Sequence, residues 1–348
     1  MHMADALLSP VVGGTMWVVS AGTIAYCSKK VRQELDNRNV PLMGVLGAFL
    51  FAAQMINFTI PATGSSGHLG GGLLLTILLG PCAAFLTIAS VLVVQALFFA
   101  DGGLLALGCN IFNMGFIPAF IVYPFIFRNI LGKNPSRSRL TGAIMVSALV
   151  GLQLGPFGVV LETYFSGISA LPFTTFVLLM QPIHLAIGVV EGLVTVAVVT
   201  FVYQARPEIL RTALEARPIG EYPVRAIVTA FLVAAIFMGG IVSWFASNKP
   251  DGLEWAISKA TGKEELKGPE QGIHGVLAVV QETTAFMPEY TFRKPAGAST
   301  EGPKREDEQN KNEGNRVGTS TAGIIGTLLT LVLAFGCGFI LKKRNQPV

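Results

Sequence analysis

The first two residues of the chain, Met1 and His2, carry three nitrogen atoms that could bind one metal ion. These are the free amine of Met1, the backbone nitrogen of His2 and the Nδ1 atom of its ring, and they close two adjacent chelate rings. A fourth nitrogen would complete a square, the arrangement that favours Ni(II) or Cu(II). Such binding removes the amide proton, a cost that only a strongly bound metal offsets. The alternative is a histidine that stands near the chain start by accident, for instance from an expression tag.

His68 is the candidate for the fourth nitrogen. It is the only histidine of the segment IPATGSSGHLGGGLL at 60–74, where glycines let the backbone approach another group closely. Alone it would be typical of a solvated loop histidine, but the topology derived below places it on the same side of the membrane as His2. The two histidines together therefore predict a transition-metal site. Ser66 of the same loop is a candidate for supporting that site.

Other polar residues stand inside apolar stretches. His184 and Glu191, in QPIHLAIGVVEG, are two helical turns apart on one face, and ionisable residues within a membrane are functional candidates by default. The favoured alternative is a satisfied hydrogen bond between helices. Asn110 and Asn113, in GCNIFNMG, could orient a ligand or the N-terminal segment, or could bond neighbouring helices. His274 lies in a polar loop, where we expect it to be solvated.

The apolar stretch GVLGAFLFAAQ carries small residues at every fourth position, namely Gly44, Ala48 and Ala52. They line one face of the expected helix, and small residues let a second helix approach closely. That second helix could belong to a partner subunit or to the same chain.

The composition is that of a membrane protein. The chain has 348 residues, of which 51% are hydrophobic and 13% charged, whereas soluble domains are about 25% charged. No basic stripe suggests binding to nucleic acid, although the net charge is +4. The four cysteines all lie in apolar runs and include no CxxC pair, so we expect them to pack between helices. The chain contains neither a GxxxxGK[ST] phosphate loop nor an HExxH motif, which excludes a P-loop ATPase and a zinc protease of that kind.

Eight apolar runs are expected to be helices, because backbone N–H and C=O groups find no hydrogen-bond partners in lipid and must bond to each other within the segment. They are 11–27, 41–59, 71–100, 105–127, 140–165, 180–205, 225–246 and 321–341. Basic residues form four clusters: Lys29, Lys30, Arg32 and Arg38; Arg128, Lys133, Arg137 and Arg139; Arg206, Arg211, Arg217 and Arg225; and Lys342, Lys343 and Arg344. The positive-inside rule makes all four cytoplasmic, so the N-terminus and the loops 60–70, 101–104 and 166–179 are expected outside.

This topology requires an odd number of crossings between residues 60 and 128. The run 71–100 should therefore be two short helices broken at Gly80-Pro81, because proline ends or kinks a helix. The expected fold is an all-α polytopic membrane protein, with seven helices in residues 1–215 and two more in residues 216–348. Residues 247–320 form a long outside loop, whose far part, PAGASTEGPKREDEQNKNEGNRVGTS, is typical of a flexible linker.

The chain start bears on the metal hypothesis. Residues 1–10 carry no Lys or Arg, so we expect no signal peptide. We further expect Met1 to be retained, since the bulky His2 makes a poor substrate for methionine removal.

Several separated motifs resemble one family. The segments MHMADALLSP, GSSGHLGGG, GCNIFNMG and HLAIGVVEG resemble the metal-capture membrane subunit of energy-coupling-factor transporters, in the nickel/cobalt group. The likeness covers about residues 1–215. The segment PDGLEWA at 250–256 looks like the small two-helix companion subunit of the same transporters, here fused to the capture subunit.

The resemblance implies a substrate-capture subunit that binds its metal outside, while a membrane scaffold (T) subunit and separate ATPase subunits drive release inside. It implies metal ligands at Met1, His2 and His68, no enzyme activity in this chain and no bound organic cofactor. The protein would lie in the lipid of the cell (inner) membrane, with the N-terminus outside and the C-terminus cytoplasmic. Residues 216–348 would assist metal loading.

The metal is expected to be Ni(II), with Co(II) possible. Cobalt-type members tend to begin as MHIMEGFLP, and Ala6 of this chain stands where their glycine falls. Three other classes stay open: a cobalt uptake subunit, a metal-sensing membrane protein that does not transport, and an intramembrane enzyme that uses His184 and Glu191.

Overall fold

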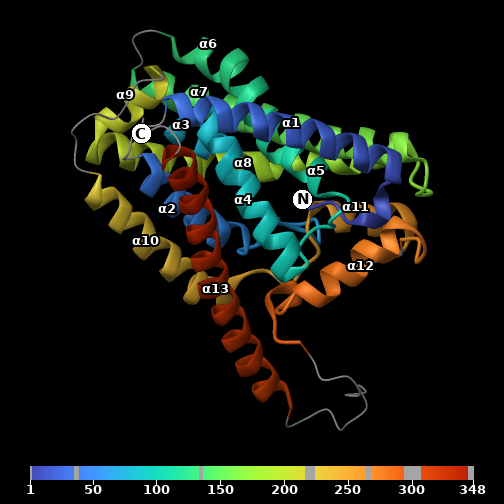
Figure 1. The fold of residues 1–348 in the computed structure, drawn as a ribbon. Helices are drawn as coiled ribbons and strands as arrows, with labels where there is room; N and C mark the ends of the chain where they lie inside the picture. Colours follow the sequence, from blue (N-terminus) through green and yellow to red (C-terminus); the bar gives the residue numbers. More distant parts are fainter. Residues whose placement is uncertain are drawn as a thin grey trace.

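The computed structural model shows an all-α membrane protein with a short two-stranded ribbon (Figure 1). The structure describes residues 2–34, 39–132, 136–215, 224–263, 266, 268–293 and 307–343. Six helices of the described residues are long and apolar enough to cross a membrane, and two shorter apolar helices cover Val40–Gln54 and Arg225–Gly240. The all-helical prediction is confirmed.

The elements of the first half begin with a short 3-10 turn that follows the predicted chelating residues. In chain order they are η1 (Asp5–Leu7), α1 (Pro10–Glu34), α2 (Asn39–Gln54), β1 (Phe58–Thr59), β2 (Ser66–Gly67), α3 (Gly72–Leu79), α4 (Pro81–Phe99), α5 (Leu107–Ile111), η2 (Phe112–Phe127) and α6 (Arg128–Leu131). The strands β1 and β2 pair antiparallel, with Phe58 opposite Gly67. Their ribbon brings the His68 segment back towards the helices.

The predicted break at Gly80-Pro81 is confirmed. Gly80 has a φ of 79°, and Pro81 begins α4, where its missing N–H costs no hydrogen bond. Because α3 has only 8 residues, the predicted total of nine crossings stays a prediction. A second departure from α-helix occurs in η2, a π-helix that contains Pro118 and Pro124. Each proline removes a backbone donor, which favours such wider turns.

The second half contains two long helices followed by the region that carries the PDGLE segment. In chain order the elements are α7 (Arg137–Ser166), α8 (Phe173–Ala205), α9 (Pro207–Glu215), α10 (Arg225–Gly240), η3 (Val242–Phe245), α11 (Gly252–Thr261), α12 (Ile273–Thr284), η4 (Pro288–Tyr290) and α13 (Asp307–Lys343). Helices α10 and α13 pack against each other and against α2, so the two halves share one core. In Figure 1, α6 and α9 lie at the end of the molecule opposite α11 and α12.

The segment 247–320, which is expected outside, contains the helices α11 and α12. The prediction of a flexible linker is wrong for residues 307–320, which are helical as the start of α13, while residues 294–306 lie outside the described part of the chain. The composition of 307–320 cannot bury a core, but these residues continue the helix of the following apolar span.

Candidate metal centre

The segment that follows Met1 is fixed to the loop after α4 and to α5. Asn110 accepts a hydrogen bond from the backbone nitrogen of Met3 at 2.8 Å and donates to its carbonyl at 3.3 Å. The backbone nitrogen of Gly103 also donates to Met3 at 2.9 Å, and Asp5 accepts from the backbone of Ala106 at 2.9 Å. These bonds fix the backbone that directly follows His2.

The His68 loop is held from the opposite direction by Glu191 of α8. The carboxylate accepts hydrogen bonds from the backbone nitrogens of Gly70 at 2.7 Å and Gly71 at 3.2 Å. Gly71 has a φ of 72°, and a Cβ atom there would lie 2.0 Å from a methyl carbon of Leu50. The glycine run is therefore needed where the loop turns into α3 against α2.

His2 and His68 lie face to face. Their ring centroids are 4.9 Å apart and the ring planes differ by 12°. The two residues come from segments 66 positions apart, and both rings are nearly buried. The structure thus brings together the two histidines on which the metal prediction depends.

The hydrogen bonds of His68 determine which of its nitrogens can bind a metal. Nδ1 lies 3.1 Å from the carbonyl oxygen of Leu69, which can only accept, so Nδ1 carries the hydrogen. Burial lowers the pKa of the His68 ring to about 3, which keeps the imidazole neutral. The lone pair therefore belongs to Nε2, as a metal ligand requires.

A chain of amides sets the roles of the two His2 nitrogens. Gln54 donates through Nε2 to the carbonyl of Gly70 at 2.9 Å, so its Oε1 accepts from Gln95 Nε2 at 3.0 Å. The Oε1 of Gln95 then faces His2 Nε2 at 3.2 Å, which assigns the hydrogen to Nε2. Nδ1 is therefore the nitrogen of His2 that can bind a metal ion.

Asp101 lies against that second nitrogen. Its Oδ1 atom is 3.0 Å from His2 Nδ1, and its Oδ2 atom accepts a hydrogen bond from the hydroxyl of Tyr290 at 2.5 Å. Burial alone would raise the pKa of Asp101, but the His2 ring more than offsets it and holds that pKa below its usual range. The ionised carboxylate provides a place for positive charge beside the ring.

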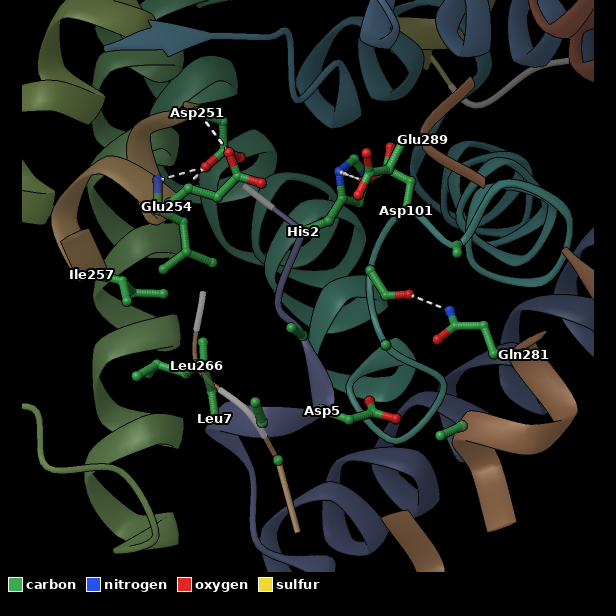
Figure 2. A pocket seen from close by; sticks show the side chains of 18 of the residues that line it. His2, Asp5, Leu7, Asp101, Asp251, Glu254, Ile257, Leu266, Gln281 and Glu289 are labelled. Atoms are coloured by element: carbon green, nitrogen blue, oxygen red, sulfur yellow. Dashed lines mark hydrogen bonds and ion pairs between the residues drawn. The ribbon is translucent and has the colours of Figure 1, made fainter. Parts of the chain in front are cut away.

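A cavity of about 890 Å³ opens beside the two histidines. Figure 2 shows Asp251 and Glu254 on one side of His2, and Asp101 and Glu289 on the other. The acidic side chains that line the cavity are Asp5, Asp101, Asp251, Glu254, Glu270 and Glu289, and a basic one is Lys249. A cavity lined mainly by one sign of charge raises the local concentration of counter-ions, here cations.

Two of the predicted site residues lie apart from the histidine pair. Ser66 donates to the carbonyl of Lys249 at 2.7 Å and so contacts the PDGLE segment. Asn113 donates to Glu162 of α7 at 2.7 Å, which is a bond between helices. Met1 lies outside the described residues.

The remaining predicted residues have packing or hydrogen-bonding partners within the chain. Gly44 of α2 faces Leu331 and Phe335 of α13, a helix of the same chain, and Ala48 and Ala52 are buried within the chain. His184 Nδ1 lies 2.8 Å from the carbonyl of its own α8 residue Met180. His184 and Glu191 therefore have separate partners, the helix backbone and the His68 loop.

The expectation that His274 is solvated was wrong. His274 is buried, and its Nε2 atom lies 2.8 Å from the carbonyl oxygen of Leu8. Helix α12 thus packs on the N-terminal segment. The residues that sequence reasoning missed at the site are Gln54, Gln95, Asp101, Asp251 and Tyr290. Asp101 had a signal, since it precedes two glycines in a loop expected on the same side as His2.

The candidate metal ligands brought together by the structure are the two histidine rings. Among the described residues no group of three or more His, Cys, Asp and Glu side chains is placed to hold a metal ion. A tight site at His2 and His68 therefore needs backbone or terminal nitrogens in addition to the two rings.

The fold and this site define a membrane protein of metal transport. Residues 2–209 match the family model described as the cobalt uptake substrate-specific transmembrane region, and residues 225–343 match the PDGLE domain. The chain belongs to this cobalt uptake family, with a PDGLE domain fused behind it. It is a nickel/cobalt-type metal-transport membrane subunit, and the family is one of transporters rather than enzymes.

The relatives agree with this assignment. A putative metal transport protein of Haloquadratum walsbyi is 37% identical over 62% of this chain and 95% of its own length. A putative fused nickel transport protein of Archaeoglobus fulgidus is 33% identical over 68% of this chain and 76% of its own length. The crystal structure of a truncated transition metal transporter shares 30% identity, with a TM-score of 0.52 over 59% of this chain and 99% of that one.

Proposed function

We propose that the chain is the substrate-capture subunit of an ATP-driven, energy-coupling-factor importer for nickel ions. The ion would bind outside the cell to the amine of Met1, the backbone nitrogen and Nδ1 of His2, and Nε2 of His68. The proposal requires Met1 to be the free N-terminus of the chain. A T subunit and ATPase subunits would drive release into the cytoplasm.

The observation that carries the proposal is the stacking of His2 and His68 at 4.9 Å beside an acidic cavity. The hydrogen bond at Nδ1 of His68 places the lone pair of that ring on Nε2, and the contact of His2 Nε2 with Gln95 makes Nδ1 the metal-binding candidate of His2. The ring of His2 also has Asp101 beside it, which stabilises added positive charge. Both rings are therefore prepared for a cation.

Nickel is favoured over cobalt by the ligands. Four nitrogens in one plane suit Ni(II), whereas oxygen ligands suit harder ions. Relatives that are named fused nickel transport proteins match both in Archaeoglobus fulgidus, at 33% identity, and in Rhodobacter capsulatus, at 31%. A cobalt transport protein of Geobacter sulfurreducens is 28% identical.

The distribution of basic residues supports an orientation with the metal centre outside. Lys29 and Lys30 lie near the end of α1, Arg128 begins α6 and Arg206 lies between α8 and α9. In Figure 1, α6 and α9 lie at the end away from α11 and α12. By the positive-inside rule the end with α6 and α9 faces the cytoplasm, and the cavity faces outwards. The membrane would be the inner membrane of the cell.

The test is metal binding by the purified full chain in detergent. Elemental analysis after equilibration with equal Ni(II) and Co(II) should find about one nickel per chain, and calorimetry should give the Ni(II) affinity. His2→Ala, His68→Ala and one alanine inserted before His2 should each abolish tight binding. The matched control adds the same alanine after Val348, which should leave binding unchanged. Unchanged affinity in the variant extended before His2 would falsify the N-terminal chelate, and preferential cobalt loading would identify a cobalt subunit.

A further inference from the structure

The PDGLE segment lies directly on the His68 loop. The backbone nitrogen of Ser66 donates to the carbonyl of Pro250 at 2.8 Å, and its hydroxyl donates to the carbonyl of Lys249 at 2.7 Å. The indole nitrogen of Trp255 donates to the carbonyl of Thr63 at 3.0 Å. Hydrogen bonds thus join the two segments at several points, although they are more than 180 residues apart in the chain.

Asp251 of this segment is fixed in position by the helix that it caps. Its Oδ1 atom accepts hydrogen bonds from the backbone nitrogens of Leu253 and Glu254, both at 2.8 Å, at the N-terminus of α11. Glu254 completes the capping box by accepting from the backbone nitrogen of Asp251 at 3.0 Å. The other oxygen, Oδ2, lies 3.8 Å from His68 Nε2, too far for a hydrogen bond but close enough to attract a cation bound at that nitrogen.

The glycine of the motif explains how the segment can come so close. A Cβ atom at Gly252 would lie 3.0 Å from Cε1 of His184 and 3.2 Å from a side-chain carbon of Ile183. Both contacts are with α8, whose Glu191 holds the other side of the same loop. The His68 loop is therefore held between α8 and the PDGLE segment.

Residues of α12 and η4, which follow the PDGLE segment in the chain, support the surroundings of His2. Tyr290 of η4 donates its hydroxyl to Asp101, and Asp101 faces His2 Nδ1 at 3.0 Å. Gln281 of α12 donates to the carbonyl of Gly102 at 2.7 Å and so fixes the loop that carries Asp101. Figure 2 shows Gln281 and Glu289 of this region around the loop of Asp101.

We propose that Asp251 and Tyr290 are positioning residues of the metal centre: Asp251 places a carboxylate at the Nε2 side of His68, and Tyr290 holds the carboxylate of Asp101 at the Nδ1 side of His2. The inference rests on the proposed function, because it takes the two histidines as ligands. Each carboxylate faces the ring nitrogen that would bind the metal, Asp101 at Nδ1 of His2 and Asp251 at Nε2 of His68, so it would stabilise a cation bound there. Losing a residue that supports a metal ligand in this way costs about 10–100-fold in affinity. The PDGLE domain thereby completes the metal centre of the first domain.

The experiment measures Ni(II) affinity and the Ni(II) absorption spectrum of the full chain carrying Asp251→Asn or Tyr290→Phe. Asparagine is as good an N-cap as aspartate, so Asp251→Asn removes the charge and keeps the start of α11. Phenylalanine keeps the ring of Tyr290 and removes only the hydroxyl. Each variant should weaken Ni(II) binding by at least about tenfold and shift the ligand-field bands, with the melting temperature of the metal-free protein unchanged.

Three controls separate positioning from general effects. Glu282→Gln removes an exposed charge from α12, and Tyr164→Phe removes an exposed hydroxyl from α7, so both should bind Ni(II) as the unaltered chain does. Glu254→Gln lowers the charge of the same cavity but keeps the capping box. If it weakens binding as much as Asp251→Asn, the field of the cavity is responsible and the positioning role is overturned.

The two proposals fail in different ways. Loss of less than about tenfold in both Asp251→Asn and Tyr290→Phe, with an unchanged spectrum, overturns this inference while His2→Ala and His68→Ala still abolish binding. Binding that survives in His2→Ala and His68→Ala overturns the proposed metal centre itself.

Discussion

The carboxylate of Glu191 lies 2.7 Å from the backbone nitrogen of Gly70, so a residue buried in α8 holds the loop that presents His68. Glu191 is 2% exposed, and it satisfies two backbone donors that would otherwise be buried without a partner. This relationship gives the intramembrane carboxylate a role in shaping the site, in place of the catalytic role considered for it with His184.

Replacing Glu191 with glutamine should loosen the His68 loop. The glutamine amide has one acceptor oxygen, so one of the two loop N–H groups would lose its partner, at about 1–3 kcal/mol. We expect Glu191→Gln to lower the free energy of unfolding by that amount and to weaken Ni(II) binding by about tenfold. Chemical denaturation and calorimetry measure the two effects. Glu282→Gln is the matched control, and equal affinities in the two variants would contradict the role of Glu191.

Asn110→Ala should release the N-terminal segment. The substitution removes both hydrogen bonds to the backbone of Met3, and each such net bond contributes about 1 kcal/mol. We expect faster hydrogen exchange at the Met3 amide and about tenfold weaker Ni(II) binding, because His2 is no longer held against Asp101. Asn110→Asp keeps the acceptor for the Met3 amide. Its Ni(II) affinity should therefore lie between those of the unaltered chain and Asn110→Ala.

Asn129→Ala is the control for this prediction, since Asn129 is exposed on α6 and its side-chain amide donates to the carbonyl of Phe125 in the preceding turn, at the end of η2. A Met3 amide that stays protected in Asn110→Ala would show that the segment is held by other contacts.

Much of this site could be predicted from the sequence, because donor chemistry and side-of-membrane arguments act through residue types and short spacings. From these arguments His2 and His68 were predicted to lie together, and the conformational limits of proline predicted the helix break before Pro81. The same reasoning missed His274 because its burial comes from Leu8, 266 positions away, and no local pattern marks that contact. Asp251 and Tyr290 were missed for the same reason, since loop residues gain a role only when the chain folds back onto the first domain.

Gly103→Ala should displace the N-terminal segment by steric conflict. A Cβ atom at Gly103 would lie 1.8 Å from Oδ1 of Asp5 and 2.5 Å from its backbone nitrogen, so the backbone itself must move. Overpacking of this kind costs about 1–3 kcal/mol, and we expect a lower melting temperature together with weaker Ni(II) binding. Gly142→Ala is the control, because nothing lies within 4 Å of its added methyl group and alanine favours the helix. A Gly103→Ala variant as stable as Gly142→Ala would show that the segment does not pass this close.

Gly44→Leu should separate α13 from α2 and thereby test whether the small-residue face is internal. A Cβ atom at Gly44 would lie 3.1 Å from Cβ of Phe335 and 3.3 Å from the backbone oxygen of Leu331, and the rest of a leucine has no room between the helices. We expect a loss of about 1–3 kcal/mol in stability. Gly336→Leu places the same side chain on α13 where nothing lies within 4 Å, so it should be tolerated. If Gly44→Leu were as stable as Gly336→Leu but failed to assemble with the proposed T subunit, the face would serve a partner subunit instead. Thermal unfolding in detergent and co-purification with that subunit distinguish the two outcomes.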